Sequence, residues 1–229
     1  MNQITGGKNM GCVKEFMDSW IFKGPFRCVV AGASGSGKSS LMVNILKHHL
    51  SLIEPELKGI VWCYSEWQTG YESLLEHKNT KDLIHFVKGP PSNDMFNVKA
   101  GHTLIVIDDQ MNTIVGREYE EMFTKKSHHT NTSIIHLVQN IFLKSMRTMS
   151  LNSDYLILFK NPRDMSQIRH LASQMYPGNS KFLVAAYTEA THEHPHTYLA
   201  IDLTQSASNR GRVRTNILPG QVQWVYIPA

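Results

Sequence analysis

The chain has 229 residues, a mass of 26.0 kDa and a formal net charge of +4. Hydrophobic residues make up 41% of it and charged residues 18%, which excludes a disordered chain and allows one α/β domain with a buried core. No apolar run approaches the roughly 20 residues that span a bilayer, and the polar start over residues 1–14 does not have the pattern of a signal peptide. We therefore expect no stable membrane insertion.

The cysteines and the distribution of charge bear on the cellular compartment and on possible binding partners. Cys12, Cys28 and Cys63 have no paired spacing, which indicates a reducing compartment and no zinc site built on thiolates. Residues 140–170 carry five Lys/Arg against two Asp, and residues 205–214 carry three Arg and no acid. Contact with a polyanion and a solvated basic surface both explain these segments, and charge alone does not separate the two.

Along the chain, apolar runs alternate with helical patterns, which predicts βα units and a mostly parallel sheet flanked by helices. The expected strands of this sheet are 26–31, 59–64, 103–107, 133–138 and 155–159, and the expected helices are 39–50, 115–126 and 164–174. After Pro177-Gly178 the pattern changes, and short antiparallel strands are expected at 182–189, 197–203 and 222–227. The predicted organisation is an N-terminal extension over 1–21, a core over 22–180, and a C-terminal β extension of the same domain over 181–229.

Residues 32–39 match the pattern G-x-x-x-x-G-K-[ST] in full, between a β-branched strand and a helical pattern. The glycines let successive backbone N–H groups converge on phosphate oxygens, and the following helix adds the positive end of its dipole. Lys38 supplies a point charge for the β- and γ-phosphates, and the Ser39 hydroxyl is placed to bind Mg²⁺. The pattern therefore predicts a phosphate-binding loop (P-loop) for ATP and Mg²⁺, with the binding residues Gly32, Ser34, Gly35, Ser36, Gly37, Lys38, Ser39 and Ser40.

The apolar strand 103–107 ends in Asp108-Asp109, and charges at such a position are not explained by packing. We expect Asp108 to hold Mg²⁺ opposite Ser39. Asp109 is expected to polarise the attacking water near the γ-phosphate. Glu66, just after the second strand, is the alternative catalytic acid.

Strand 133–138 ends in Gln139-Asn140. The Gln139 amide reaches the γ-phosphate if this strand lies between the P-loop strand and the Asp108 strand, and would then report whether that phosphate is present. Stabilising the transferring phosphoryl group also needs an arginine. The candidates are Arg147, Arg163 and Arg169; Arg163 is preferred because it follows the fifth strand, at an expected sheet edge that a neighbouring subunit could meet. Contact with DNA phosphate and a plain surface charge explain each arginine equally well.

The order of the P-loop, Asp108-Asp109, Gln139, the segment LNSDYLILFKNPRD at 151–164 and the segment QMYPG at 174–178 carries a family resemblance over about residues 22–202. The chain resembles the genome-packaging ATPases of the FtsK–HerA superfamily. It is most similar to those of Polinton-type (Maverick) elements, adinto-like viruses and virophages, which are relatives of the poxvirus packaging ATPase. The segment at 151–164 is far more specific than the P-loop, which many families share. Asp109 departs from the wider superfamily, where Glu is common, and this leaves the identity of the catalytic base open.

The resemblance implies an α/β P-loop NTPase of the additional-strand (RecA/FtsK-like) type, with the Gln139 strand between the other two motif strands. It implies a homo-oligomeric ring, a pentamer or hexamer, with an arginine supplied in trans. Such a ring pumps double-stranded DNA into a preformed viral capsid at its portal vertex. The expected location is the cytoplasm or nucleus of the host cell, or the virion.

Other functions share parts of this pattern. A DNA helicase or transfer-type ring motor has the same fold, and a nucleotide kinase uses the same loop but needs an Arg-rich lid. A non-catalytic DNA-binding module would not require Lys38, Ser39 and Asp108 together. The alternating histidines of residues 192–196 fit a zinc site, but Pro195 and the expected turn favour a solvated loop.

Overall fold

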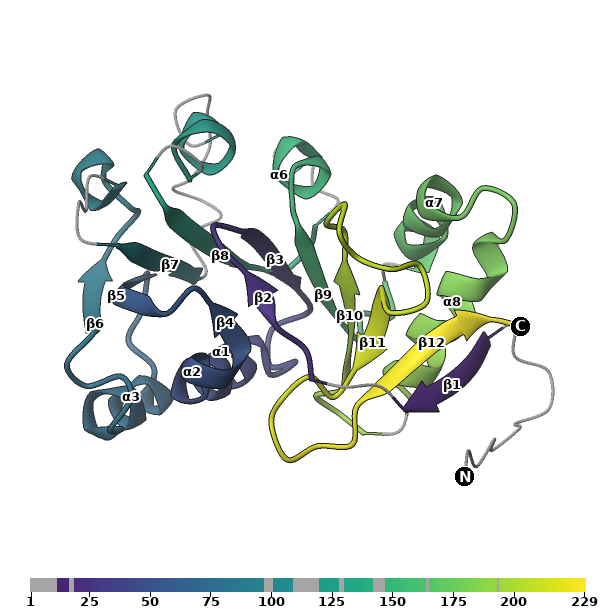
Figure 1. Cartoon of the computed structure of the whole chain (residues 1–229), viewed down its shortest axis with the longest axis horizontal. Coiled ribbons are helices and arrows are strands. Elements are labelled where there is room, and N and C mark those ends of the chain that lie inside the picture. The colour runs from purple at the N-terminus through teal and green to yellow at the C-terminus, as the bar shows by residue number, and fades with distance from the viewer. Residues whose placement is uncertain are drawn as a thin grey trace.

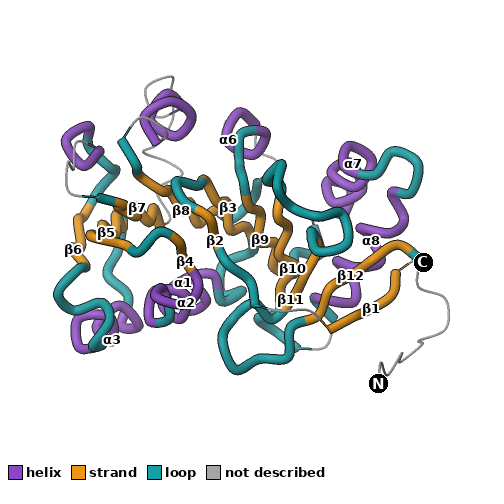
Figure 2. The backbone as a smooth tube through the Cα atoms, viewed as in Figure 1, coloured by secondary structure: helices purple, strands orange, loops and turns teal. Residues whose placement is uncertain are grey.

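The computed structural model describes residues 12–16, 19–96, 101–108, 120–127, 130–141, 147–163, 165–192 and 194–229. One large sheet runs through the whole molecule, with helices on both of its faces (Figures 1 and 2). Within the described residues it has ten strands in the order β1-β12-β11-β10-β9-β3-β8-β7-β5-β6. A separate two-stranded sheet pairs β2 with β4.

The strands of the large sheet are β1 (Cys12–Phe16), β3 (Arg27–Ala31), β5 (Leu57–Tyr64), β6 (Ile84–Lys88), β7 (His102–Asp108), β8 (Thr132–Val138), β9 (Tyr155–Phe159), β10 (Tyr198–Asp202), β11 (Val213–Thr215) and β12 (Trp224–Pro228). The small sheet consists of β2 (Phe22–Lys23) and β4 (Ile53–Glu54). The α-helices are α1 (Lys38–Lys47), α2 (His49–Leu52), α3 (Glu72–Glu76), α6 (Arg147–Leu151), α7 (Met165–Met175) and α8 (Ser180–Ala190). Short 3-10 turns cover Thr69–Tyr71 and Asn93–Phe96, and Met122–Lys126 is a π-helical turn.

The parallel half of the sheet confirms the predicted fold class. β3 pairs in parallel with β8 on one side and with β9 on the other, and β8 pairs in parallel with β7. The Gln139 strand therefore lies between the P-loop strand and the Asp108 strand, as the resemblance implied. Because parallel strands share a direction, all three motifs emerge at the carboxyl edge of the sheet.

Residues along the central strands alternate between two buried clusters, which explains why their sequences read as unbroken apolar runs. Along β3, Val29 and Ala31 belong to one core cluster, while Cys28 and Val30 belong to the other. Residues of α1 fill the second cluster, and residues of α7 and α8 fill the first. In Figure 1, α1, α2 and α3 lie on one side of the sheet, and α6 and α7 lie on the other.

The sheet continues beyond β9 with antiparallel strands, so the predicted antiparallel β extension is present. β10 pairs with β9, β11 with β10, β12 with β11, and β1 with β12. β9 is therefore an interior strand, and the expectation that it forms the sheet edge is wrong. The addition of β10 is what moves the edge outward.

The predicted strand over 182–189 is also wrong, because this segment is helix α8. Its buried residues are Phe182, Leu183, Ala186, Tyr187 and Ala190, a spacing that places them on one helical face. Val184 and Thr188 favoured a strand, but packing against α7 and the first core cluster decided the outcome.

The structure also bears on membrane-spanning helices and on the chemistry of the cysteines. No helix in the described ranges is both long and apolar enough to cross a membrane. The three cysteines are free thiols in the interior, and burial raises the pKa of Cys12 to about 11 and that of Cys63 to about 12. These thiols therefore stay protonated at neutral pH and contribute packing rather than chemistry.

Candidate functional site

The P-loop links the carboxyl end of β3 to the start of α1, and at several of its positions only glycine fits, as Gly37 and Gly32 illustrate. Gly37 caps the helix with φ +100°, a left-handed conformation that other residues rarely adopt. At Gly32 an added Cβ would lie 2.6 Å from Phe159 Cβ and 2.7 Å from Ser36 Oγ, so no side chain fits. These constraints turn the N-terminal end of α1 toward the space enclosed by the loop.

Lys38 is folded back onto its own loop. Its Nζ donates hydrogen bonds to Gly32 O at 2.7 Å and to Ala33 O at 3.0 Å. Ser36 Oγ is buried in the same loop and has no hydrogen-bond partner among the described residues. An ammonium group on a flexible stem, beside a buried hydroxyl, fits a loop built to exchange its own contacts for those of phosphate oxygens.

Asp108 ends β7 and is buried, with 3% of its surface exposed. Its Oδ2 accepts a hydrogen bond from Ser39 Oγ at 2.9 Å and another from Tyr71 OH at 2.7 Å. A buried carboxylate needs such donors to offset its desolvation. The Ser39 hydroxyl and the Asp108 carboxylate are oxygen ligands of the kind that Mg²⁺ prefers, so the predicted pair meets and fits a Mg²⁺ site.

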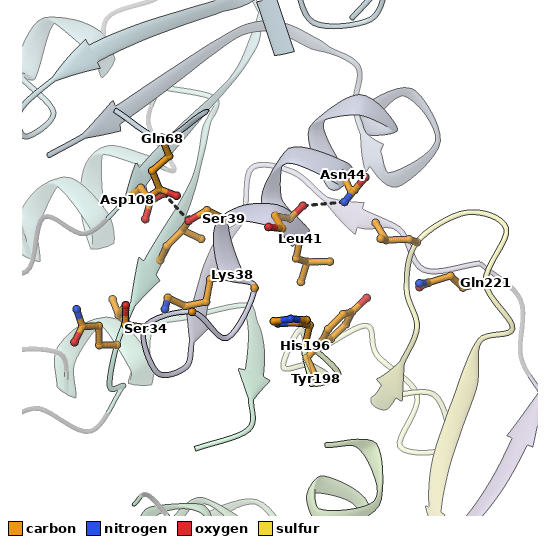
Figure 3. Close-up of a pocket in the computed structure, with 17 residues that line it drawn as sticks. Ser34, Lys38, Ser39, Leu41, Asn44, Gln68, Asp108, His196, Tyr198 and Gln221 are labelled. Atoms are coloured by element: carbon orange, nitrogen blue, oxygen red, sulfur yellow. Dashed lines mark hydrogen bonds between the residues drawn. The ribbon is translucent and has the colours of Figure 1, made fainter. Parts of the chain in front are cut away.

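One pocket of about 600 Å³ brings most of the predicted binding residues together (Figure 3). Gln139 lines it from the end of β8, the strand between β3 and β7. The predicted residues in its lining are Ser34, Gly35, Gly37, Lys38, Ser39, Ser40, Asp108 and Gln139. Gly32 and Ser36 support the loop from outside this lining.

The predicted catalytic arginines and Glu66, the alternative catalytic acid, do not line this pocket. Arg163 is exposed in the turn after β9, with its backbone N–H donating to Asn161 Oδ1 at 3.2 Å. Arg147 begins α6 and lines a different cavity, between α6 and α7. Glu66 is exposed and lies 3.7 Å from Lys88 as an ion pair. Asp109 lies outside the described residues, and its role stays a prediction.

Two contributors to the site, Tyr71 and His196, were not predicted from the sequence. Tyr71, from the turn before α3, holds Asp108, and it is buried in an aromatic cluster with Trp62 and Phe86. The only available signal was that a buried acid needs a donor, which does not say which tyrosine provides it.

His196 is the second missed contributor. It belongs to the histidine segment predicted to be a solvated loop; its side chain is exposed, as predicted, and its Nδ1 lies 3.0 Å from Ser36 O. A Cβ on Gly37 would lie 3.2 Å from His196 Cβ and Nδ1, so the ring rests directly on the P-loop. In the described part of the chain, no three His, Cys, Asp or Glu side chains gather as a metal site.

The three arginines of 205–214 serve the fold. Arg210 forms an ion pair with Glu15 at 2.7 Å, and Arg212 donates to Asp202 O at 2.7 Å. Arg214 lies over the Trp20 ring at 5.6 Å. The contacts of Arg210 and Arg214 join this segment to β1 and to Trp20, and that of Arg212 lies within the extension, so all three arginines have a structural role.

The P-loop after β3, the central β8 and the acid at the end of β7 define the P-loop NTPase fold with an additional strand. No protein-family model matches the chain. DNA packaging protein OPG160 of Monkeypox virus is 29% identical over 159 residues, which are 61% of this chain and 50% of that protein. The chain thus spans about half the length of this curated relative.

Solved structures share the fold. The DNA-packaging ATPase B204 of Sulfolobus turreted icosahedral virus aligns with a TM-score of 0.53 at 15% identity, over 83% of this chain and 96% of that one. The genome packaging NTPase B204 of Sulfolobus turreted icosahedral virus 2, in complex with ATP-gammaS, aligns with a TM-score of 0.51 at 16% identity over the same shares. At these identities the likeness concerns the fold.

Proposed function

We propose that this chain is an ATP-hydrolysing motor that packages double-stranded viral DNA into a preformed capsid. The observation that carries the proposal is the pocket in which Lys38, Ser39, the buried Asp108 and Gln139 meet at the carboxyl edge of the parallel sheet. This convergence suits hydrolysis of a nucleoside triphosphate better than simple DNA binding, because a binding module has no use for a buried acid beside the P-loop hydroxyl.

Each residue has a role in this proposal. Lys38 exchanges its two carbonyl acceptors for β- and γ-phosphate oxygens, and Ser39 and Asp108 hold Mg²⁺, which neutralises phosphate charge when bound. Asp109 takes the proton from the water that attacks the γ-phosphorus as the bond to the leaving ADP oxygen breaks, with Glu66 as the alternative base. Gln139 stands at the end of β8, where it can contact the γ-phosphate.

The DNA-packaging part of the proposal draws on the named relatives. The similarity to OPG160 and the fold shared with B204 support a packaging ATPase. An assignment to the FtsK–HerA superfamily, and within it to the Polinton-type and virophage group, belongs to the proposal. So do the pentameric or hexameric ring, the portal-vertex partner, and action in the host cytoplasm or nucleus or in the virion.

The arginines support a shared site. Among the described residues no arginine lines the pocket, and Arg147 and Arg163 both lie outside it, which supports an arginine supplied by a neighbouring subunit. Arg163 is exposed at the carboxyl edge of the sheet and is our preferred finger. Exposed Arg147, Lys160 and Arg169 are then candidates for DNA phosphate contacts.

Phosphate release in the presence of Mg²⁺ and duplex DNA tests the enzymatic part. Lys38→Ala should lower the rate about a hundredfold or more, because it removes a charge that stabilises the transferring phosphoryl group. Lys47→Ala is the matched control, since this lysine lies in the last turn of the same helix. Undetectable hydrolysis by the wild-type chain would instead favour the non-catalytic DNA-binding module.

Two other functions are separated by their products. A helicase would part the strands of a forked duplex, whereas the proposed motor would hydrolyse ATP on intact duplex without separating it. A nucleotide kinase would transfer the γ-phosphate to a nucleoside monophosphate. Phosphate release that duplex DNA stimulates and nucleoside monophosphates leave unchanged is the expected result.

A further inference from the structure

The pocket extends well beyond the P-loop. In Figure 3 one end contains Lys38, Ser39 and Asp108, and the other extends past α1 toward the C-terminal extension. The lining at that far end consists of Leu41, Asn44, His196, Tyr198, Leu218 and Gln221. Nothing in the hydrolysis chemistry described above uses these side chains.

Strand direction explains how the extension reaches the P-loop. β10 runs antiparallel to β9, so its first residue Tyr198 pairs with the last residue of β9, Phe159. β11 runs antiparallel to β10, so the loop after Thr215 returns to the same edge. Residues 194–197 and 216–223 therefore both lie beside the P-loop, although they are more than 150 residues away from it in sequence.

This wall is fixed by its own hydrogen bonds. The Tyr198 hydroxyl accepts from Ile217 N–H at 3.2 Å, and Thr215 Oγ1 donates to Tyr198 O at 2.7 Å. Gln223 Nε2 donates to Ile217 O at 3.3 Å, which closes the second loop. A wall held in place before a ligand arrives costs less ordering on binding.

The chemistry of the far end suits a flat, uncharged heterocycle. Leu41 and Leu218 offer apolar contact, and His196 and Tyr198 contribute aromatic rings to the same lining (Figure 3). Two amides stand at the rim: Asn44, whose Nδ2 donates to Ser40 O at 2.9 Å, and the exposed Gln221. Sites for small ligands combine apolar and aromatic surface with a few polar groups in this way.

We propose that the C-terminal β extension forms the nucleoside half of the pocket and that Asn44 and Gln221 select adenine. The inference rests on the proposed function, because it needs a triphosphate at the P-loop. An amide offers a carbonyl acceptor and N–H donors, which complement the amino group and ring nitrogens of adenine. Guanine presents the acceptors O6 and N7, which suit Arg or Lys. Among the described residues, the lining of the far end contains no Arg and no Lys.

Calorimetric titration with three Mg²⁺-bound ligands tests this assignment. They are the non-hydrolysable analogue AMPPNP, its guanine counterpart GMPPNP, and inorganic tripolyphosphate, which has no nucleoside. The test protein is the double variant Asn44→Ala, Gln221→Ala, and both positions are exposed, so the fold should tolerate the change. The control is Gln205→Ala, the same change on the β10–β11 connection at the opposite edge of the sheet.

The wild-type chain should bind AMPPNP about tenfold more tightly than GMPPNP, and the double variant should lose about tenfold in AMPPNP affinity, as expected for one or two hydrogen bonds. Its affinity for tripolyphosphate should not change, and Gln205→Ala should behave as wild type. Unchanged AMPPNP affinity in the double variant would overturn the inference, and so would an equal loss for tripolyphosphate. A wild-type chain that binds neither AMPPNP nor tripolyphosphate would overturn the proposed function itself, and this inference with it.

Discussion

Two hydroxyl groups meet on one oxygen of Asp108, and they play different parts. Ser39 comes from the P-loop helix and can turn toward a metal, whereas Tyr71 comes from a separate turn and is packed among aromatic rings. The Tyr71 ring stacks on Phe86 with 5.5 Å between centroids. We infer that Tyr71 keeps the carboxylate in place as a positioning residue when the Ser39 hydroxyl leaves it.

Tyr71→Phe should therefore weaken metal binding while keeping the aromatic packing. We expect the Mg²⁺ concentration for half-maximal hydrolysis to rise about tenfold, since partners behind a metal ligand typically have effects of this size. Mn²⁺ binding with AMPPNP present, followed by electron paramagnetic resonance, measures the same change without turnover. Tyr64→Phe, in the same aromatic cluster, is the control; equal Mn²⁺ affinity in both variants would remove Tyr71 from this role.

Single residues of the site were predictable where a pattern of neighbouring residues in the sequence marks them. Gly32 to Ser39 form a contiguous pattern, and Asp108 ends a run of buried residues, so both could be read directly from the sequence. Tyr71 and His196 could not, because their contacts depend on how distant segments fold back. His196 reaches Ser36 from 160 positions away, through the return of β10 beside β9.

At the scale of elements, β8 carries a buried histidine between the P-loop strand and the acid strand. Burial lowers the pKa of His136 to about 3, far below its ordinary value of 6.5. Between these values the unfolded chain binds a proton that the folded chain does not, so the folded state loses stability as the pH falls from 6.5 toward 3. Above 6.5 both states are neutral and this contribution is constant.

His136→Gln should remove that contribution. Below pH 6.5 the unfolding free energy of the wild-type chain should fall more steeply than that of the variant, by about 1.4 kcal/mol per pH unit. Urea unfolding at a series of pH values from roughly 4 to 7, which covers most of the range between the two pKa values and its upper end, measures both slopes. His85→Gln, the same change at an exposed position of β6, should keep the wild-type slope. Parallel slopes for wild type and His136→Gln would contradict the assignment.

The strands were predictable from the sequence where both of their faces are buried in the core. β3, β5, β7, β8 and β9 all read as short apolar runs bounded by polar residues. The composition of α8 suits both a strand and a helix, and its contacts with α7 decide for the helix. β1 was missed because its pairing partner, β12, lies more than 200 positions along the chain.

At the scale of the whole molecule, the antiparallel extension changes both the edge of the sheet and the shape of the pocket. It moves the sheet edge from β9 to β1, and it forms one wall of the pocket beside the P-loop. The boundaries predicted at residues 21/22 and 180/181 remain predictions. Both β1 and α8 nevertheless contribute residues to the first core cluster, so each segment packs with the core.

A ring with shared sites predicts a specific result when two inactive variants are mixed. Lys38→Ala damages the P-loop side of a site, and Arg163→Ala damages the side proposed to come from the neighbour. In an equal mixture, about a quarter of the interfaces should combine an intact P-loop with an intact arginine, if subunits assemble at random. Phosphate release should therefore recover to about a quarter of the wild-type rate.

Arg169→Ala provides the comparison for that experiment. Arg169 is another exposed arginine, on α7, and its loss alone should leave most of the activity if Arg163 is the finger. Absence of recovery at every mixing ratio would count against Arg163 acting in trans. Recovery with Arg169→Ala instead would transfer the role to that residue.

The central claim is that ATP hydrolysis in this pocket moves double-stranded DNA. Displacement of a third strand from a DNA triplex tests it most directly, because a motor travelling along the duplex removes that strand without opening the duplex itself. The wild-type chain should release the third strand in the presence of ATP and Mg²⁺, and Lys38→Ala should not. A wild-type chain that hydrolyses ATP on this substrate, yet leaves the third strand in place, would contradict the account.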